Sequence, residues 1–394
     1  MIRPLPRKKL IEFGWDVPSP AYLRDNLAAM EARCPFFDGV MIRLPAEAGG
    51  GNVFDVKQWA GSTGEARERE IKTFAALPPA RRFTDNFLTL YGASTMDWFS
   101  DADWEAVLDN VRYVASAAKA GRCQGVCWDA EPYGGINPWR LGEQPGSDTR
   151  TFADYERQVR ERGAQFMGAL QQAFPGLTVF ALRLLSDFQD GSPFSQPLFN
   201  VRDPRKQVAV LENAWWGLHP AFLNGMLDAA APDVTIIDGN EDAYYYTAAL
   251  DYYRAYHDLR QPALALVAPE NTRKYAAQYR VGHALAVDYV VGRWAELKGF
   301  PDERRKQALE LTEDERARWF EHNTYQALAT ADEYVWCYSE RMNWWTGDDI
   351  PPGIERAISS ARSKVEAGEP LGFVVEPMLG EARAKARARW SSPS

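Results

Sequence analysis

Two acidic side chains stand at the end of one apolar segment, residues 125–133, which reads G-V-C-W-D-A-E-P-Y. Because side chains alternate along a strand, Asp129 and Glu131 would lie on the same side as the small residues of the segment. Pro132 disfavours helical geometry for the residue before it, so Glu131 is expected to stay extended. The spacing predicts a strand that delivers two carboxyl groups to its C-terminal end. The structural alternative is a helix-capping aspartate followed by a solvated glutamate.

Two further strand-like segments also lead into acids. Residues 234–238 end in Asp238 and are followed by Glu241, and residues 333–339 precede Glu340. Hydrolysis of a glycosidic bond needs one protonated carboxyl group for the leaving oxygen and one ionised carboxylate to attack or to activate water. Acids held close together acquire different pKa values, which supplies both states at neutral pH. Acids from three strand ends therefore indicate this chemistry.

The chain is rich in aromatic residues, with 14 Trp, 17 Tyr and 19 Phe. Most are expected in the core, but several follow predicted strands directly. Flat rings with a polar edge suit the C–H face of a sugar, and an arginine at a strand end can bind a ligand oxygen. The predicted substrate-binding residues are Trp15, Asp16, Arg43, Tyr91, Tyr133, Trp139, Trp216, Tyr245 and Trp344.

Strand-like and helical segments alternate along the chain, as in an α/β fold. Eight strands are predicted, at residues 10–15, 38–44, 82–91, 125–133, 177–185, 234–238, 263–268 and 333–339. This count is typical of a (β/α)8 TIM barrel, whose active sites lie at the C-terminal ends of the strands. Long loops at residues 133–150 and 186–217 are expected to form a cleft at that face. Residues 371–375 are an alternative strand, which would make Glu340 the seventh-strand residue if residues 263–268 were peripheral.

No change in composition divides the 394 residues. A single catalytic barrel domain is therefore predicted for residues 1–376, because α/β barrels commonly use this much chain in one domain. Residues 377–394 contain basic side chains at a spacing of two, which forms no helical face, and are predicted to be a solvated tail.

Composition excludes several classes of function. The net charge of −9 argues against binding to nucleic acid or to an anionic membrane surface. No apolar run of membrane-spanning length and no signal peptide is visible, so the expected location is the cytoplasm, unless an export signal has been removed. The four cysteines favour reduced core thiols, and the four histidines form no metal-binding motif. We therefore expect no metal and no cofactor; the oligomeric state stays open.

The segment at residues 125–133 resembles the D-x-E ending of the fourth strand in chitinase-like and endo-N-acetylglucosaminidase-like families of (β/α)8 glycoside hydrolases. The resemblance implies that Glu131 is the general acid and that Asp129 orients it or the acetamido group of the substrate. Cys127 stands where the chitinase pattern has a further aspartate, which argues against substrate-assisted cleavage. The ending W-C-Y-S-E-R-M-N-W-W resembles late strands that deliver a glycosidase nucleophile.

Together these features predict a glycoside hydrolase that cleaves an oligo- or polysaccharide. Glu131 is the expected proton donor with Asp129 beside it, Glu340 is the first choice for nucleophile or base, Glu241 is the second, and Asp238 has a supporting role. Two alternatives are a noncatalytic carbohydrate-binding barrel and a barrel enzyme that uses Mg or Ca bound to carboxylates. A Schiff-base aldolase is disfavoured, because no predicted strand ends in a lysine.

Overall fold

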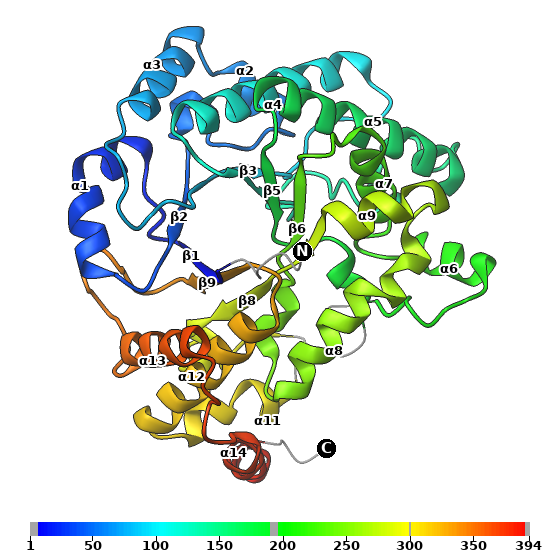
Figure 1. Cartoon of the computed structure of the whole chain (residues 1–394). Coiled ribbons are helices and arrows are strands. Elements are labelled where there is room, and N and C mark those ends of the chain that lie inside the picture. The colour runs from blue at the N-terminus through cyan, green and yellow to red at the C-terminus, as the bar shows by residue number, and fades with distance from the viewer. Residues whose placement is uncertain (1–6, 190–195, 299–300, 391–394) are drawn as a thin grey trace, which may run out of the picture.

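The structure is a computed structural model that describes residues 7–189, 196–298 and 301–390. Helices surround a central ring of strands (Figure 1). The strands are β1 (Lys9–Gly14), β2 (Gly39–Ile42), β3 (Phe87–Tyr91), β4 (Gly125–Asp129), β5 (Thr178–Ala181), β6 (Thr235–Asp238), β7 (Tyr279–Val281), β8 (His283–Ala286) and β9 (Tyr334–Ser339). The helices are α1 (Pro20–Arg33), α2 (Val56–Ala60), α3 (Gly64–Ala75), α4 (Asp101–Ala120), α5 (Phe152–Ala173), α6 (Pro204–Leu211), α7 (His219–Ala229), α8 (Ala249–Arg260), α9 (Thr272–Gln278), α10 (Val287–Val290), α11 (Asp302–Arg305), α12 (Glu313–Thr330), α13 (Ile354–Ala367) and α14 (Glu376–Trp390).

The described strands form one parallel sheet in the order β7-β6-β5-β4-β3-β2-β1-β9-β8. β7 and β8 are separated by Gly282 alone, and β7 pairs with β6 whereas β8 pairs with β9. They are therefore two halves of one broken strand that closes the ring. A Cβ atom at Gly282 would lie 3.0 Å from the carbonyl oxygen of Tyr334, so the break falls where the backbones approach closely. The (β/α)8 barrel predicted from the sequence is confirmed.

Local sequence signals explain where the main helices begin. Ser19 accepts a hydrogen bond from Tyr22 N at the start of α1, and Ser100 caps α4 in the same way. Thr312 and Glu315 form a reciprocal capping box at the start of α12. Each cap satisfies an N–H group that has no partner within the helix.

The seventh strand is not where the sequence predicted it. Residues 263–268 lie largely in a 3₁₀ helix, Pro262–Leu266, and the strand forms later, within residues 270–293, for which the sequence predicts a helix. The predicted segment is short, and Pro262 precedes it. Residues 371–375 form no strand either, so Glu340 follows the eighth strand of the ring.

The predicted solvated tail is instead a helix. α14 spans Glu376–Trp390 and buries Leu379, Ala382 and Ala386. It lies beside α11 at the edge of the molecule (Figure 1). Arg383 donates to Gln307 Oε1 at 2.9 Å and to Thr247 Oγ1 at 3.1 Å. The small alanines of this segment provide the packing face that the charge pattern concealed.

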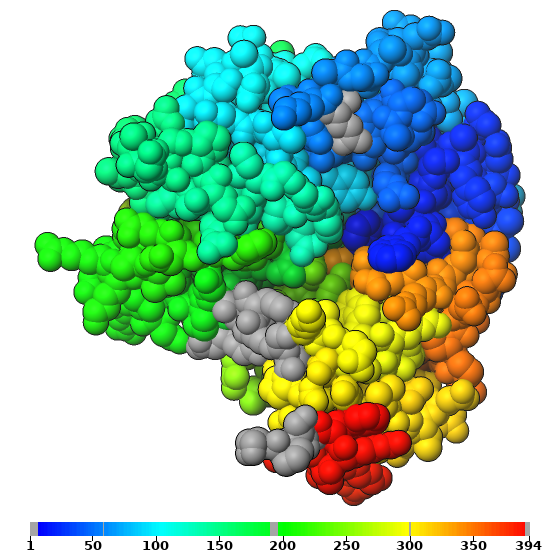
Figure 2. All heavy atoms as spheres, turned by 180° about the vertical axis from the view of Figure 1, so that it is seen from behind, coloured from blue at the N-terminus to red at the C-terminus, as the bar shows by residue number. Residues whose placement is uncertain are grey.

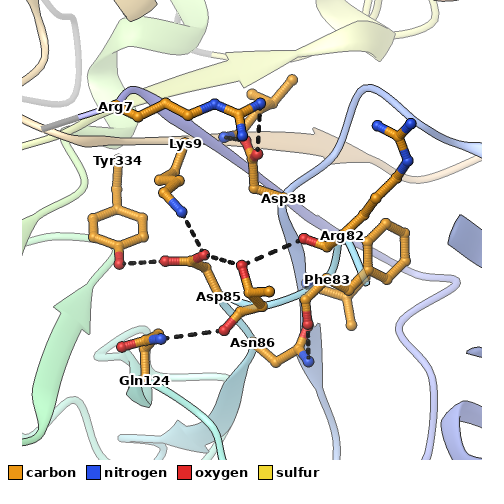
Figure 3. Close-up of polar contacts among 12 residues, drawn as sticks. Arg7, Lys9, Asp38, Arg82, Phe83, Asp85, Asn86, Gln124 and Tyr334 are labelled. Carbon is orange, nitrogen blue, oxygen red and sulfur yellow. Dashed lines mark hydrogen bonds and ion pairs between the residues drawn. The ribbon is translucent and has the colours of Figure 1, made fainter. Parts of the chain in front are cut away.

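The N-terminal end of the barrel is closed by a polar network (Figure 3). Asp85, which is buried, accepts hydrogen bonds from Lys9 Nζ at 2.7 Å and from the Tyr334 hydroxyl at 2.8 Å. Asp38 accepts from Leu10 N and forms an ion pair with Arg362. Both of these carboxylates are paired, which fits a stabilising role at this face of a barrel.

No described helix is long and apolar enough to cross a membrane.

Candidate active site

A cleft opens at the C-terminal ends of the strands, on the face shown in Figure 2. It has two lobes. The first, the acidic lobe, has a volume of about 400 Å³ and contains Glu131, Glu241 and Glu340. The second, the Arg43 lobe, has a volume of about 370 Å³ and contains Arg43 and Asp129. Three aromatic side chains line both lobes and form the partition between them: Phe13, Tyr133 and Tyr338.

The end of β4 places its two acids on the cleft side, as the alternation predicted. Trp128 points the other way and packs against Phe166 and Phe222 of the helix layer. Asp129 is buried and accepts hydrogen bonds from Glu131 N at 3.1 Å and from the Tyr133 hydroxyl at 2.8 Å. Burial raises the pKa of Asp129 to about 7, and the charge of Glu131 adds to the rise. Asp129 therefore exchanges a proton near neutral pH, directly beside Glu131.

The acid that follows β6 is held by an arginine. Arg183 is buried and donates two hydrogen bonds to Glu241, at 3.1 and 2.7 Å, and a third to Asp187 at 2.8 Å. Burial raises the pKa of Glu241, Arg183 opposes the rise and Glu131 adds to it. Although burial alone lowers it, the pKa of Arg183 is raised well above its ordinary value by Glu241 and Asp187. The bidentate pair fixes the orientation of Glu241 at the wall of the acidic lobe.

The acid that follows β9 is hydrogen-bonded by aromatic side chains. Trp294 Nε1 donates to Glu340 Oε2 at 3.1 Å, and the Tyr338 hydroxyl donates to Oε1 at 3.4 Å. The backbone N–H of Glu340 donates to Asp288 at 2.7 Å. Trp294 and Tyr338 are uncharged donors to the carboxylate of Glu340. Among the described residues, no hydrogen bond joins this carboxylate to a cationic side chain.

Tyr338 lies close to three glutamates of the acidic lobe, Glu131, Glu241 and Glu340. Its pKa is raised by burial first, and then by the charges of Glu340, Glu241 and Glu131. One phenol ring therefore marks the point around which acids from β4, β6 and β9 converge. This convergence is the arrangement that the sequence predicted for these glutamates.

Asp238, the remaining predicted catalytic acid, does not line the cleft. It is fully buried, and its oxygens accept four hydrogen bonds: from Ser186 N and Oγ at 2.9 and 2.7 Å, from Asn240 N at 3.0 Å and from the Tyr279 hydroxyl at 2.5 Å. A carboxylate surrounded in this way has no free lone pair aimed at a substrate. Its position is that of a structural residue that ties β6 to the neighbouring loop.

Several predicted substrate-binding residues line the cleft as expected, and others do not. Trp15, Arg43, Tyr91 and Tyr133 line the Arg43 lobe, and Tyr245 lines the acidic lobe. Outside both lobes lie Asp16, Trp139, Trp216 and Trp344.

Packing draws these four side chains away from the cleft. Trp139 is buried and donates to Ala130 O at 2.7 Å, while Trp216 stacks on His219. Trp344 is buried against Phe36 and Phe37. Asp16 accepts from Trp344 N at 2.7 Å and so anchors the loop after β9. A large aromatic side chain near a strand end can pack into the helix layer as readily as it can contact a ligand.

Other cleft residues were not predicted from the sequence. Arg183 follows β5 without any local motif, and its role is visible only through its contacts with Glu241 and Asp187. Trp294 lies in the turn that follows α10. The unpredicted lining residues also include Phe13, Tyr244, Trp336 and Tyr338. Alternation along β1 and β9 could have identified Phe13, Trp336 and Tyr338, because they lie on the inner side of these strands. From the two long loops, only Tyr133 lines either lobe among the described residues.

A second pair of acids lies outside the cleft, behind β1. Glu12 is fully buried, and its carboxyl group lies beside that of Asp16. Burial raises the pKa of Glu12 well above 4.5, and Asp16 raises it further. Glu12 is therefore neutral in the folded protein and ionised in the unfolded chain at neutral pH. Its contribution to stability is present below the ordinary pKa and is lost as the pH rises towards the folded-state pKa.

Glu12→Gln should remove this pH dependence, because an amide keeps a donor for Asp16 and carries no charge. We expect the free energy of unfolding of the unaltered protein to fall by up to about 1.4 kcal/mol per pH unit above pH 5 from this group. Urea unfolding at pH 5 to 9 measures the slope, and the exposed Glu105→Gln serves as control. Equal slopes for Glu12→Gln and the unaltered protein would contradict the assignment.

The described residues contain no group of three or more His, Cys, Asp or Glu side chains that could hold a metal ion. All four cysteines are free and buried, as predicted. Of the acids in the acidic lobe, Glu241 is bonded to Arg183, and Glu340 is bonded to Trp294 and Tyr338.

Neither a family model nor a curated protein matches the sequence. Among solved structures, the chain is similar to a GH5_18 protein from Streptomyces cattleya in complex with GlcNAc, with 11% identity, a TM-score of 0.46 and coverage of 93% of this chain and 82% of that chain. It is also similar to a family GH18 chitinase from Chromobacterium violaceum, with 13% identity, a TM-score of 0.41 and coverage of 91% of this chain and 84% of that chain. A third similar structure is a protein from Burkholderia cenocepacia described as a lyase/mutase, with 17% identity, a TM-score of 0.32 and coverage of 99% of this chain and 90% of that chain.

The order and pairing of the strands in this chain establish its barrel fold.

Proposed function

We propose that this protein is a glycoside hydrolase that uses two carboxyl groups of the acidic lobe. The observation that carries the proposal is the convergence of Glu131, Glu241 and Glu340 on one aromatic-lined cleft at the C-terminal face of the barrel. Glycosidic bond cleavage needs a proton donor and an ionised partner on either side of the bond. The cleft volume of about 400 Å³ lies in the range of small-molecule sites.

Glu131 is the proposed proton donor. Asp129 lies beside it, is bonded to its backbone N–H, and has a pKa of about 7. Asp129 can therefore hold or release a proton directly beside Glu131. The pair therefore supplies a proton to the leaving oxygen and regains one afterwards near neutral pH.

Glu340 is the proposed ionised partner, because its hydrogen bonds come from uncharged donors and leave its charge available. Glu241 is engaged on both oxygens by Arg183, so it fits the shaping of the site better than attack on the sugar. The rings of Tyr244, Tyr245 and Trp336 line the same lobe and offer apolar faces to a sugar ring.

Product release from a panel of neutral and acidic glycans tests the proposal. We expect the protein to release reducing sugar from at least one glycan, and proton NMR of the fresh product to show a single anomer. Retention of the anomeric configuration would indicate that the second carboxylate attacks directly, and inversion would indicate that it activates water. Saccharide binding without product would support the noncatalytic barrel and overturn the proposal.

A further inference from the structure

The Arg43 lobe has a different charge from the acidic lobe. Arg43 is its only cationic side chain and Asp129 its only acidic one among the described lining residues. Both oxygens of Asp129 are engaged, and burial raises its pKa to about 7. Asp129 is about half ionised at pH 7, and its charge towards this lobe falls further below pH 7. Across the partition, four glutamates and two arginines line the acidic lobe: Glu131, Glu241, Glu296, Glu340, Arg293 and Arg341.

Arg43 is exposed and follows β2 directly. Its backbone N–H donates to Pro18 O at 3.1 Å, which fixes the base of the side chain, and its guanidinium hydrogen-bonds to Tyr91. No carboxylate within the described residues forms an ion pair with it. A guanidinium has five N–H donors in a planar fork, so most of the donors of Arg43 remain available to a ligand.

The remaining walls of this lobe suit a sugar ring. Trp15 is 69% exposed and its Nε1 is tied to the Tyr338 hydroxyl at 3.1 Å, so the indole is held at the edge of the lobe. Tyr91 and Tyr133 pack edge to face on the opposite side. Gly14 and Gly50 add no side chains, which leaves room beside the guanidinium.

We propose that the Arg43 lobe binds a saccharide unit that carries an anionic group, a carboxylate or a sulfate, while the neighbouring unit occupies the acidic lobe. This inference deepens the proposed function and rests on it for the identity of the ligand as a saccharide. Arg43 binds the anion through its fork of N–H groups, and Trp15 supplies the apolar face. Arg43 thus determines specificity and takes no part in proton transfer.

Binding to a glycan array tests the inference without relying on turnover. The array contains neutral glycans and their carboxylated and sulfated counterparts, and the probe is labelled Glu131→Gln protein. We expect anionic glycans to be retained above their neutral counterparts, and Arg43→Gln in the same background to weaken that binding about tenfold. Raising the salt concentration should reduce the difference, because exposed charges are screened. The carboxylated and sulfated arms show which anion is recognised.

Arg81→Gln is the matched control, since Arg81 is exposed in the loop that precedes β3, at the opposite end of the barrel. It removes the same charge and should leave glycan binding unchanged. Equal retention of neutral and anionic glycans, no retention of any glycan, or equal effects of the two arginine substitutions would overturn the inference. Hydrolysis of glycans together with equal binding of neutral and anionic glycans would overturn it while the proposed function stands. Arg43-dependent binding of anionic glycans without hydrolysis would support it while the catalytic proposal fails.

Discussion

Glu131→Gln should reduce the turnover of any glycan that the protein cleaves by about a thousandfold, within the range typical of a lost general acid. The amide has nearly the shape of the carboxyl group but has no proton to give to the leaving oxygen. The backbone N–H of residue 131 would still donate to Asp129, so the end of β4 keeps its geometry. Initial rates of product release, measured at saturating glycan, give the effect.

Two comparisons separate this loss from misfolding. Thermal unfolding of Glu131→Gln should match that of the unaltered protein, because Glu131 is only half-buried and its side chain lies at the cleft surface. A substrate with a good leaving group, such as a dinitrophenyl glycoside, needs little protonation and should recover much of the rate. Unchanged turnover of natural glycans would show that Glu131 is not the donor.

Arg183→Met should lower the free energy of unfolding by about 3 to 5 kcal/mol at pH 7 and above, the cost of breaking a buried ion pair on one side. The substitution leaves Glu241 and Asp187 buried without their cation. Without Arg183, burial and Glu131 raise the pKa of Glu241 unopposed. A protein that contains an acid with a raised folded-state pKa becomes less stable as the pH rises. The loss in free energy of unfolding should therefore be smaller at pH 5 than at pH 8.

A double-mutant cycle gives this prediction its control. Combining Arg183→Met with Glu241→Gln removes the uncompensated charge of Glu241, so the double variant should be more stable than Arg183→Met alone. Urea unfolding of the four proteins at pH 5 and pH 8 provides the coupling energy. Additive effects at both pH values would show that the two side chains do not interact in solution.

The sequence predicted the barrel through alternation and turn signals, which depend on neighbouring residues. Most of its eight strands lie where apolar segments predicted them, and the acids of β4 and β9 reach the cleft because strand direction fixes where a strand ends. The seventh strand was missed because Gly282 splits it into two short halves, neither of which has a strand pattern of its own. Strand pairing across the closed ring, not local propensity, determines that element.

Candidate residues were harder to predict than the fold. Asp238 and Glu241 are three positions apart, yet one is enclosed by four donors and the other reaches the cleft, a difference that depends on Ser186 and Tyr279 from other elements. Trp139 and Trp344, like Trp15, follow predicted strands in the sequence, but they pack inwards. Sequence identifies groups capable of chemistry; which ones face the solvent depends on distant partners.

The partition between the lobes consists of side chains rather than backbone. Trp15 donates to the Tyr338 hydroxyl, and that hydroxyl donates in turn to Glu340. One phenol is therefore hydrogen-bonded to a residue of each lobe. A rotation of Phe13, Tyr133 or Tyr338 would merge the two hollows into a single trough without moving the main chain. Ligand length would then matter: a polymer long enough to lie across the rings engages both ends at once, whereas a monomer occupies only one.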